Sequence, residues 1–573
     1  MTRHADNIRR FRRGAVLVVV LAGFGVLAAR AVQLQIMNAE FLQSQGNARH
    51  SRVVKDNSHR GMVLDRHGSP LAVSTPVDSV WAHPESLAGE KRSWWRVAQL
   101  LGTTSAEIGQ LLKRHHGREF MYLKRHVTPE IAERVRALQV PGVSLLREYR
   151  RYYPLGPVAG HVVGFTNIDD HGQEGVELAY DSWLRAAPGT KRVLKDPQGS
   201  AMELVESLTL PAPGKDLMLS LDRRIQYLAY RELKAAVATH RAQAGAAIVL
   251  DARTGEVLAL VNEPDFNPNN RDTFKGPAFR NRAVTDTYEP GSTLKPFIIG
   301  VALESGRFKP DTPIDTAPGT LRVGDRLIKD MHNYGLLTVA RVIEKSSNVG
   351  ASRIALALNR HSMWEMLRGA GFGELTGISL PGEVVGVLRA PTRWVPVDQA
   401  ALSYGYGISV TPLQLARAYG AIANDGVAMP LTLLKRESPV DGRRVMGAPV
   451  ARALRAMIEA ATGPNGTGAR AQVADYRIAG KTGTVRKLTP SGYSEDQYVA
   501  WFAGFAPASD PRLVMIVMVD GPRSGAYFGG EIAAPVFGRV MSGALRLLDI
   551  APDAPRPRTP PALLAAKPAG GGA

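Results

Sequence analysis

The chain has 573 residues, of which 45% are hydrophobic, and a formal net charge of +19 at neutral pH. Its length predicts two or three domains, and its hydrophobic content is ordinary for a globular protein. The absence of cysteine excludes a disulfide framework, a thiolate metal site and a cysteine nucleophile. Lysine and arginine are scattered along the chain and no nucleic-acid motif accompanies them. We therefore expect a basic, solvated surface and no nucleic-acid partner.

The N-terminal segment predicts a single membrane-spanning helix. Five arginines within residues 1–13 precede an uncharged apolar run from Gly14 to Ala29. Extended to about residue 34, a helix of this run spans the roughly 30 Å hydrocarbon core of a bilayer. The arginines favour a cytoplasmic N-terminus at 1–13, a transmembrane anchor at 14–37 and the rest of the chain outside. A cleaved signal peptide is the alternative, but Arg30, within the A-x-A-like site at 29–31, argues against cleavage.

Turn-forming and low-complexity residues divide the rest of the chain. Residues 38–214 mix short helical and extended patterns without a catalytic constellation, and the Pro- and Gly-containing stretch at 210–214 predicts a domain boundary. The second domain then covers residues 215–548. The last residues, 549–573, are rich in Pro, Ala and Gly, and we expect them to be disordered.

Hydrophobic periodicity predicts a mixed sheet with a helical insertion in the second domain. A strand at Asp216–Leu221 and a helix from Asp222 to Ala238 open this domain. Strand patterns lie near both of its ends and helical patterns lie between them, which favours an α+β fold, an α/β sandwich. The other expected strands are Ala246–Leu250, Val257–Val261, the run at Lys481, Tyr498–Phe505 and Leu513–Val519, and the clearest expected helices are Thr411–Ala423 and Pro449–Ala461.

Three short motifs carry the chemistry of this domain. Ser292-Thr293-Leu294-Lys295 fits S-x-x-K, Ser346-Ser347-Asn348 fits S-x-N, and Lys481-Thr482-Gly483 fits K-T-G. Each motif occurs by chance in many chains. Together, in this order, S-x-x-K, S-D-N and K-T-G are the signature of penicillin-binding proteins and class A β-lactamases, with Ser347 standing here in place of the aspartate. The three motifs therefore predict a serine acyl-transfer enzyme.

The first motif supplies a nucleophile and a base. Ser292 follows the Pro290-Gly291 turn and opens an apolar helical stripe, so that Ser292 and Lys295 share one helix face. A serine hydroxyl needs an adjacent base, and a partly desolvated lysine can be neutral enough to serve. In isolation the motif would be an N-capping serine with a surface lysine, but the other two motifs favour the catalytic interpretation. Pro296, which removes a backbone donor, has no predicted role.

The other two motifs supply polar groups for proton transfer and substrate binding. Ser346 and Asn348 alternate across one turn and can face the same way, where a hydroxyl can relay a proton and an amide can hold the lysine; the alternative is a polar helix cap. In the third motif the lysine offers a charge to a substrate carboxylate, Thr482 a hydrogen bond, and Gly483 room for a substrate backbone. A P-loop is excluded because Asp475 stands where its first glycine is required. No metal-ligand pattern is present, and we expect no metal or other cofactor.

Longer stretches around the motifs resemble one family. The run RNRAVTDTYEPGSTLKP at 280–296 is similar to the nucleophile region of the class B penicillin-binding proteins, above all the division-specific septal peptidoglycan transpeptidases of the penicillin-binding protein 3 type. Four upstream stretches, at 60–68, 120–125, 151–154 and 172–177, resemble the periplasmic pedestal of that family. The resemblance runs from the anchor to about residue 545 and implies the penicillin-recognising serine transpeptidase fold behind an N-terminal pedestal domain of the dimerisation type.

The resemblance also implies roles for individual residues. Ser292 would be the nucleophile and Lys295 its base, with Ser346 as proton relay, Asn348 as positioner and Lys481 completing the catalytic set. The backbone N–H groups of Ser292 and Thr484 would form the oxyanion hole. The substrate-binding residues implied by family position are Thr482, Gly483, Thr484, Arg486, Tyr404, Tyr406, Tyr527 and Phe528.

The function implied by the resemblance is D,D-transpeptidation. Such an enzyme cross-links the stem peptides of peptidoglycan at the division septum and is acylated by β-lactams. The expected partners are the cytoplasmic membrane, a polytopic lipid II polymerase and other divisome proteins. An elongation-specific class B transpeptidase is one alternative. A β-lactamase or a β-lactam sensor is another, which the long pedestal and the intact motifs disfavour.

Overall fold

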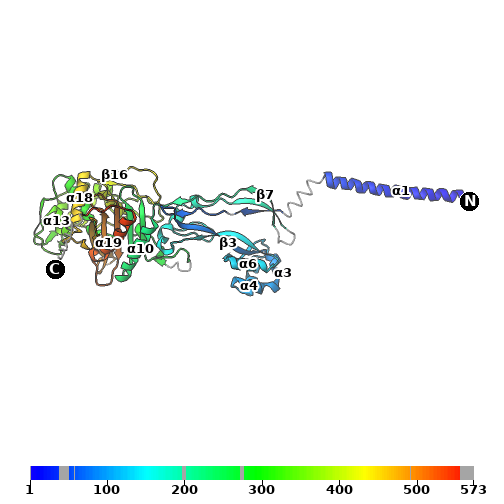
Figure 1. The fold of residues 1–573 in the computed structure, drawn as a ribbon, viewed down its shortest axis with the longest axis horizontal. Coiled ribbons are helices and arrows are strands. Elements are labelled where there is room, and N and C mark those ends of the chain that lie inside the picture. Colours follow the sequence, from blue (N-terminus) through cyan, green and yellow to red (C-terminus); the bar gives the residue numbers. More distant parts are fainter. Residues whose placement is uncertain are drawn as a thin grey trace, which may run out of the picture. The chain divides into compact units, whose positions relative to one another are not determined.

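The computed structural model describes residues 2–37, 51–56, 58–195, 202–270, 276–490 and 492–554 (Figure 1). Two compact units are present. The first comprises the residues up to 60 with 74–150 and 185–214, and the second comprises 61–73, 151–184 and the residues from 215 onward. Two segments of the expected pedestal thus pack with the transpeptidase segment. The boundaries at 214 and 548 stay a prediction. The expected pedestal start at 38–50 and the expected disordered tail, 549–573, from residue 555 onward lie outside the described residues. Residues 549–554 are described, and there Tyr476 OH donates to Ile550 O at 2.6 Å and Arg477 N donates to Asp553 Oδ1 at 2.7 Å.

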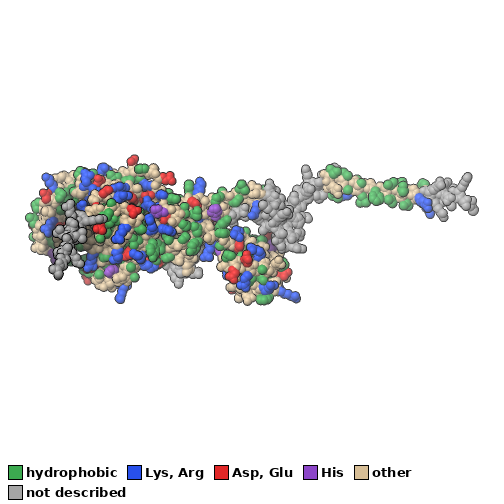
Figure 2. All heavy atoms as spheres, viewed as in Figure 1, with side chains coloured by type: hydrophobic (Ala, Val, Ile, Leu, Met, Phe, Trp, Pro, Cys, Tyr) green, Lys and Arg blue, Asp and Glu red, His purple; other side chains and the backbone are tan. Residues whose placement is uncertain are grey.

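A long apolar helix opens the chain. Helix α1 (Thr2–Val32) continues into the short π-helix η1 (Gln33–Met37). The stretch Phe11–Ile36 has a mean hydropathy of 2.4 and no buried part, and Figure 2 shows apolar side chains along its length. At about 1.5 Å per residue these 26 residues exceed the roughly 30 Å of a bilayer core. By length and composition this helix can cross a membrane, at the place predicted for the anchor.

The first unit packs short helices against strands. Amphipathic helices contribute Leu87, Val97 and Ile108 to its core, all nearly fully buried. Thr104 and Glu107 form a reciprocal capping box at the start of α5. The helices are α3 (Pro84–Gly89), η2 (Lys91–Ser93), α4 (Trp94–Leu101), α5 (Ser105–Arg114) and α6 (Pro129–Ala137); β4 (Met121–Val127) and β5 (Val143–Tyr152) pair with β3 (Pro70–Ala82), and β1 (Ser51–Asp56), β6 (Gly189–Lys195) and β7 (Met202–Thr209) form a separate antiparallel sheet.

A five-stranded antiparallel sheet forms the centre of the second unit, in the order β10-β9-β19-β18-β17. Every residue of β10 and β19 is buried, the pattern of strands that are covered on both faces. Among the strands that the structure describes, β17 has a partner on one side only. The strands are β9 (Ala244–Asp251), β10 (Val257–Glu263), β17 (Ala479–Thr489), β18 (Gly492–Ala506) and β19 (Leu513–Asp520).

Helices cover both faces of this sheet. Helices α10 and α19 lie together on one face, where Leu233 and Phe537 share a core with Val517 of β19. Helices α11 and α17 contact the other face, where Leu415 shares a second core with Ile516. Alternate residues of one strand thus enter different cores. The longer helices of the unit are α10 (Arg223–Thr239), α12 (Lys295–Glu304), α13 (Val339–Lys345), α14 (Asn348–Leu356), α15 (Arg360–Gly369), α16 (Pro396–Leu402), α17 (Pro412–Ala423), α18 (Ala448–Ala460) and α19 (Gly529–Leu547).

The predicted α+β pattern is confirmed, with one correction. Only Leu217–Met218 of the expected strand 216–221 forms a ladder, as β8 beside β2 (Val63–Leu64), and Leu219 makes an isolated bridge. The apolar alternation there reflects burial of three leucines in the core and not a long strand. The remaining elements are α7 (Gly160–Val163), α8 (Gly175–Ala179), α9 (Asp181–Leu184), α11 (Arg282–Thr285), β11 (Pro313–Asp315), β12 (Thr320–Val323), β13 (Arg326–Lys329), β14 (Leu336–Thr338), β15 (Val427–Ala428), β16 (Arg443–Arg444) and the 3-10 turns η3 (Gly156–Val158), η5 (Gly276–Phe279), η6 (Gly291–Leu294), η7 (Pro391–Arg393) and η8 (Ala469–Ala471).

Two of the pedestal-like stretches meet inside the second unit. Arg151 Nε donates to Glu177 Oε1 at 2.7 Å, and both side chains are completely buried. The Tyr153 hydroxyl accepts a hydrogen bond from Thr166 N at 2.9 Å. A buried ion pair is tolerated only where both partners are well satisfied, because each charge costs several kcal/mol to desolvate. The stretches 151–154 and 172–177 therefore form one structural element of the second unit.

Candidate active site

Ser292 lies in the tight turn η6 that leads into α12. Gly291 has a φ of +57°, which favours glycine, and its N–H donates to Gly405 O at 3.2 Å. The α-helix begins at Lys295 and not at Ser292 as predicted, and Pro296 therefore falls in its first turn, where no intrahelical donor is needed. The structure thus gives Pro296 the role that the sequence did not: it starts the helix directly after the nucleophile turn.

The Lys295 amine is surrounded by oxygen atoms. Its Nζ lies 2.8 Å from Ser292 Oγ. It lies 2.7 Å from the backbone oxygen of Ser346, 3.2 Å from Ser346 Oγ and 2.8 Å from Asn348 Oδ1. The carbonyl and amide oxygens can only accept, so they take both N–H groups of a neutral amine. Its lone pair is left for a hydroxyl, and Ser292 provides the nearer one. This geometry suits removal of the Ser292 proton.

Electrostatics favour the neutral amine. Burial lowers the pKa of the Lys295 ammonium well below its usual range, the charge of Lys481 lowers it further, and Asp330 opposes both effects. Burial also lowers the pKa of Lys481 to about 7. A lysine whose pKa is depressed in this way can act as a base near neutral pH.

The second motif lies between two helices. Ser346 ends α13 in a left-handed conformation with a φ of +59°, and Asn348 begins α14. This turn directs both side chains toward Lys295. Ser347 is the N-cap of α14, because its Oγ accepts from Gly350 N at 2.8 Å. The helix-cap interpretation of this motif therefore applies to Ser347, and the catalytic interpretation of Ser346 and Asn348 stays a prediction.

Asp330, which belongs to none of the three motifs and was not predicted, holds the second motif in place. Its carboxylate accepts hydrogen bonds from Ser347 Oγ at 2.5 Å, Asn348 N at 2.5 Å and Val349 N at 3.0 Å. A negative charge at this point also suits the positive end of the α14 dipole. No pattern in the neighbouring sequence marks this aspartate, because the fold alone brings its partners to it.

Strand β17 carries the third motif along the edge of the sheet. Lys481 and Thr482 are buried. A Cβ atom on Gly483 would come within 2.9 Å of Pro290 O and 3.1 Å of the Thr293 methyl group. This glycine therefore allows β17 to approach the nucleophile turn, a reason that differs from the predicted room for substrate backbone. In the described part of the chain, no strand pairs with the outer side of β17, and an unpaired edge can bind an extended peptide.

The threonines of this strand have different surroundings. Thr482 Oγ1 lies 2.7 Å from Thr467 Oγ1. Thr484 Oγ1 accepts from Gly529 N, the first residue of α19, at 3.0 Å. The Thr484 side chain therefore supports the protein itself, and only its backbone remains for a substrate.

The predicted aromatic residues form two groups, both of which pack on β18. Tyr493 and Tyr498 of this strand were not predicted; no motif marks them. Arg486 is exposed and follows the third motif on β17. The ring centroids lie 5.4 Å apart for Tyr404 and Tyr406, 5.3 Å for Tyr406 and Tyr493, 4.4 Å for Tyr498 and Tyr527, and 4.3 Å for Tyr527 and Phe528.

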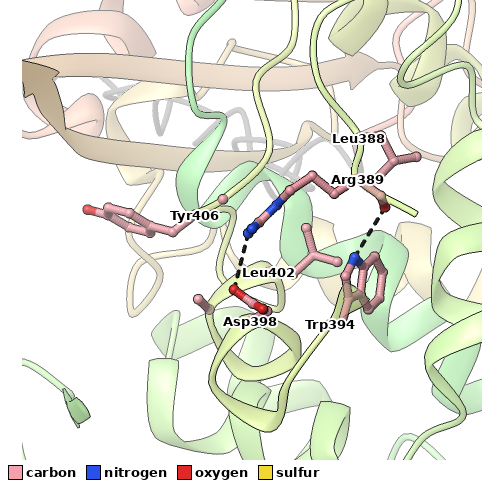
Figure 3. Close-up of a pocket in the computed structure, with 8 residues that line it drawn as sticks. Leu388, Arg389, Trp394, Asp398, Leu402 and Tyr406 are labelled. Carbon is pink, nitrogen blue, oxygen red and sulfur yellow. Dashed lines mark hydrogen bonds and ion pairs between the residues drawn. The ribbon is translucent and has the colours of Figure 1, made fainter. Parts of the chain in front are cut away.

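Tyr406, Arg389 and Trp394 are among the residues that line a small cavity of about 20 Å³ (Figure 3). Arg389 Nη2 donates to Asp398 Oδ1 at 3.1 Å beside it, and Trp394 Nε1 donates to Arg389 O at 3.1 Å. A cavity of this size has room for about one water molecule. It is therefore not the substrate site. The Arg389–Asp398 pair lines this cavity together with Tyr406 and Gly407 of the 404–407 loop.

Known proteins share this arrangement over most of the chain. The penicillin-binding protein transpeptidase domain matches residues 245–542, and the penicillin-binding protein dimerisation domain matches residues 55–219. The chain is 40% identical to the peptidoglycan D,D-transpeptidase FtsI of Escherichia coli K12 over 558 residues, 96% of this chain and 94% of that protein. The chain belongs to the class B penicillin-binding proteins.

Solved structures of penicillin-binding proteins agree. The transpeptidase domain of penicillin-binding protein 3 from Burkholderia pseudomallei is 43% identical, with a TM-score of 0.55 over 59% of this chain and 98% of that one. Penicillin-binding protein 3 from Mycobacterium tuberculosis, solved with aztreonam, is 28% identical, with a TM-score of 0.67 over 88% of this chain and 99% of that one. The predicted family and fold are confirmed, and this class B penicillin-binding protein is a serine D,D-transpeptidase.

Proposed function

We propose that this class B penicillin-binding protein cross-links peptidoglycan stem peptides at the division septum through an acyl-enzyme on Ser292. One observation carries the assignment of the nucleophile: the buried Lys295 amine lies 2.8 Å from Ser292 Oγ, and its two N–H groups are engaged elsewhere. A base held in this way is ready to take the serine proton without rearrangement.

Acylation follows from these contacts. Ser292 gives its proton to Lys295 Nζ while Oγ bonds to the carbonyl carbon between the two terminal D-alanines. The oxyanion is stabilised by the backbone N–H groups of Ser292 and Thr484. On collapse, the C–N bond breaks, and the Lys295 ammonium returns the proton to the leaving amine through Ser346 Oγ, 3.2 Å away. The products are a Ser292 ester and free D-alanine.

The second half-reaction uses the same groups in reverse. The amine of a neighbouring stem peptide gives a proton to Lys295 through Ser346 Oγ and attacks the ester carbonyl. Ser292 Oγ then leaves and is reprotonated by Lys295. The product is a cross-linking amide. With a β-lactam, the amide that opens is part of a ring, so the leaving nitrogen stays attached and hinders attack on the ester.

Substrate binding is assigned to β17 and the groups around it. Its free edge pairs with the extended donor peptide, and Lys481 with Thr482 binds the terminal carboxylate. A bound carboxylate favours the charged form of Lys481, whose pKa of about 7 in the empty site leaves that form available. Asn348 holds Lys295 in place. The approach of the substrate to Ser292 is lined by Arg486, Tyr404, Tyr406, Tyr527 and Phe528.

The decisive experiment is labelling with a fluorescent penicillin. The wild-type protein should form a long-lived adduct on Ser292, located by mass spectrometry, and Ser292→Ala should form none. A mass shift that survives in Ser292→Ala would refute the assignment. Rapid release of hydrolysed drug would instead identify a β-lactamase, the alternative from another functional class.

We also propose a topology and partners for the enzyme. The N-terminal arginines keep residues 1–13 in the cytoplasm, α1 anchors the chain, and the pedestal (38–214) and transpeptidase domain (215–548) lie in the periplasm. The pedestal offers a surface to a polytopic lipid II polymerase and other divisome proteins. The relatives named FtsI and penicillin-binding protein 3 support division over elongation.

A fragment that begins near residue 40 tests this topology. It should be soluble and still bind penicillin, because the site lies entirely within the second unit. Exported by a cleavable signal, the fragment should fail to restore septation in cells depleted of the full-length protein. Full rescue would show that the anchor is dispensable, and restored elongation without septation would favour the elongation-specific alternative.

A further inference from the structure

Glu289 lies two residues before the turn η6 that carries Ser292 and in none of the three motifs. Its Oε1 accepts hydrogen bonds from Gly407 N at 2.8 Å and from the Tyr493 hydroxyl at 2.9 Å. Gly407 ends the 404–407 loop, and Tyr493 stands on the hairpin of β17 and β18. One carboxylate oxygen thus joins three parts of the site: the segment that leads into the nucleophile turn, an aromatic loop and the hairpin that bears the third motif.

The loop and the nucleophile turn are in close contact beside Glu289. A Cβ atom on Gly405 would come within 2.0 Å of Gly291 O, so the two backbones touch directly. Any displacement of the 404–407 loop therefore reaches Gly291, the residue before Ser292. The Glu289 hydrogen bonds oppose such a displacement from the segment that leads into the turn.

We propose that Glu289 is a positioning residue that holds the 404–407 loop and the β17–β18 hairpin in the geometry that binds substrate, most firmly when its carboxylate is ionised. This inference rests on the proposed role of Ser292. The second oxygen, Oε2, is buried without a hydrogen-bond partner and is the atom free to take a proton. Hydrogen bonds to an ionised acceptor are about twice as strong as those to a neutral one. Protonation at Oε2 therefore weakens both bonds without removing the acceptor.

The surrounding groups leave Glu289 as the one that titrates. Burial raises the pKa of the Glu289 carboxyl. The hydrogen bonds from Gly407 and Tyr493 and, after them, the positive charge of Arg326 on β13 lower it by less. Burial likewise raises the pKa of the phenols that face it, Tyr404, Tyr406 and Tyr493, which stay protonated at neutral pH. As the pH falls, Glu289 is therefore protonated at a higher pH than an ordinary glutamate. Its hydrogen bonds to the 404–407 loop and to the β17–β18 hairpin then weaken.

The test separates binding from chemistry. Stopped-flow acylation of the full-length protein by a fluorescent penicillin gives Kd for the encounter complex and k2 for attack by Ser292, as functions of pH. Glu289→Gln keeps the Oε1 acceptor but cannot ionise. We expect Kd to rise about tenfold at neutral pH, equivalent to about 1.4 kcal/mol, with little change in k2. Wild-type Kd should rise on the acid side, and that rise should be absent in Glu289→Gln.

Two further variants keep the proposal falsifiable. Tyr493→Phe removes one of the two donors and should raise Kd by less than Glu289→Gln does. In the double variant, Tyr493→Phe should raise Kd by less than it does in the wild-type protein, because both substitutions act on one hydrogen bond. Glu495→Gln removes an equal charge from an exposed position on the same hairpin and should behave like wild type.

Three outcomes overturn the proposal: an unchanged Kd and pH profile in Glu289→Gln, strictly additive effects of the two substitutions, or a pH-independent loss of k2 together with thermal stability. Failure of the proposed function has a different signature, because wild-type protein would then carry no adduct on Ser292.

Discussion

Replacement of Asp330 by asparagine should damage both the stability and the acid–base behaviour of the site. The Asp330 carboxylate accepts three hydrogen bonds from residues 347–349 at the start of α14. Hydrogen bonds to a charged group contribute about 1.5–3 kcal/mol each, and neutral ones about 1 kcal/mol. Asparagine keeps part of this acceptor capacity but loses the charge and its interaction with the helix dipole. We expect a loss of about 2–4 kcal/mol in the free energy of unfolding.

The pH dependence of acylation has a definite sign. Lys295 acts as a base only when neutral, so acylation increases as the pH rises through its pKa. Asp330 raises that pKa. Without its charge the pKa of Lys295 falls further, and the acid limb of the profile should move to lower pH while the maximal rate drops because Asn348 is less firmly held. Stopped-flow acylation by a fluorescent penicillin measures both quantities.

Asp325→Asn is the matched control. Asp325 is exposed in the turn between β12 and β13 and loses the same charge, five positions before Asp330, on substitution. It should leave stability and the pH profile unchanged. An acid limb that moves to higher pH in Asp330→Asn, or that does not move, would refute the electrostatic argument. Equal effects of the two substitutions would show that only net charge matters.

The other predictions use the same assays. Lys295→Ala should lower k2 by at least about a thousandfold with a smaller effect on Kd, whereas Lys481→Ala should also raise Kd. Equal k2 values for Lys295→Ala and the wild-type protein would contradict the assignment of Lys295 as the base. Gly483→Ala should cost about 1–3 kcal/mol and slow acylation, because its methyl group collides with the nucleophile turn, whereas Gly420→Ala, which meets nothing within 4 Å, should not. Glu177→Gln breaks the buried pair with Arg151 and should lower the free energy of unfolding by about 3–5 kcal/mol. The measurement is the temperature at which the protein loses penicillin binding, which should fall.

Periodicity and motif spacing predicted much of the second unit. The helix expected at 222–238 is α10, which begins one residue later because Asp222 caps it: Asp222 Oδ1 accepts from Arg224 N at 2.9 Å. The five strands of the central sheet lie where β-rich runs were expected, because strands covered on both faces are unbroken apolar runs. The contact between Ser292 and Lys295 followed from helical spacing, even though a 3-10 turn and not an α-helix provides it.

What the sequence could not predict depends on contacts between distant segments. Asp330 is one acidic residue among many until the fold brings it to α14. The packing of residues 61–73 and 151–184 with the transpeptidase segment is likewise invisible locally. It depends on contacts between distant residues, such as the hydrogen bonds that Gln226 Nε2 donates to Val158 O at 2.8 Å and Asn269 Nδ2 donates to Tyr153 O at 2.9 Å. The reason for Gly483 also lies in a distant neighbour, since its close contact is with the turn before Ser292.

The open edge of β17 exposes the enzyme to self-association. A strand with free N–H and C=O groups is a template for the same strand of a second molecule, and proteins usually cover such an edge or place charges on it. Covering is not available where the edge must admit a peptide. Charges are present instead: Arg486 is exposed, and Lys487 pairs with Asp520 at 2.7 Å. Two copies that met edge to edge would bring their Arg486 side chains together, and because salt screens this repulsion we expect self-association to increase as the ionic strength rises.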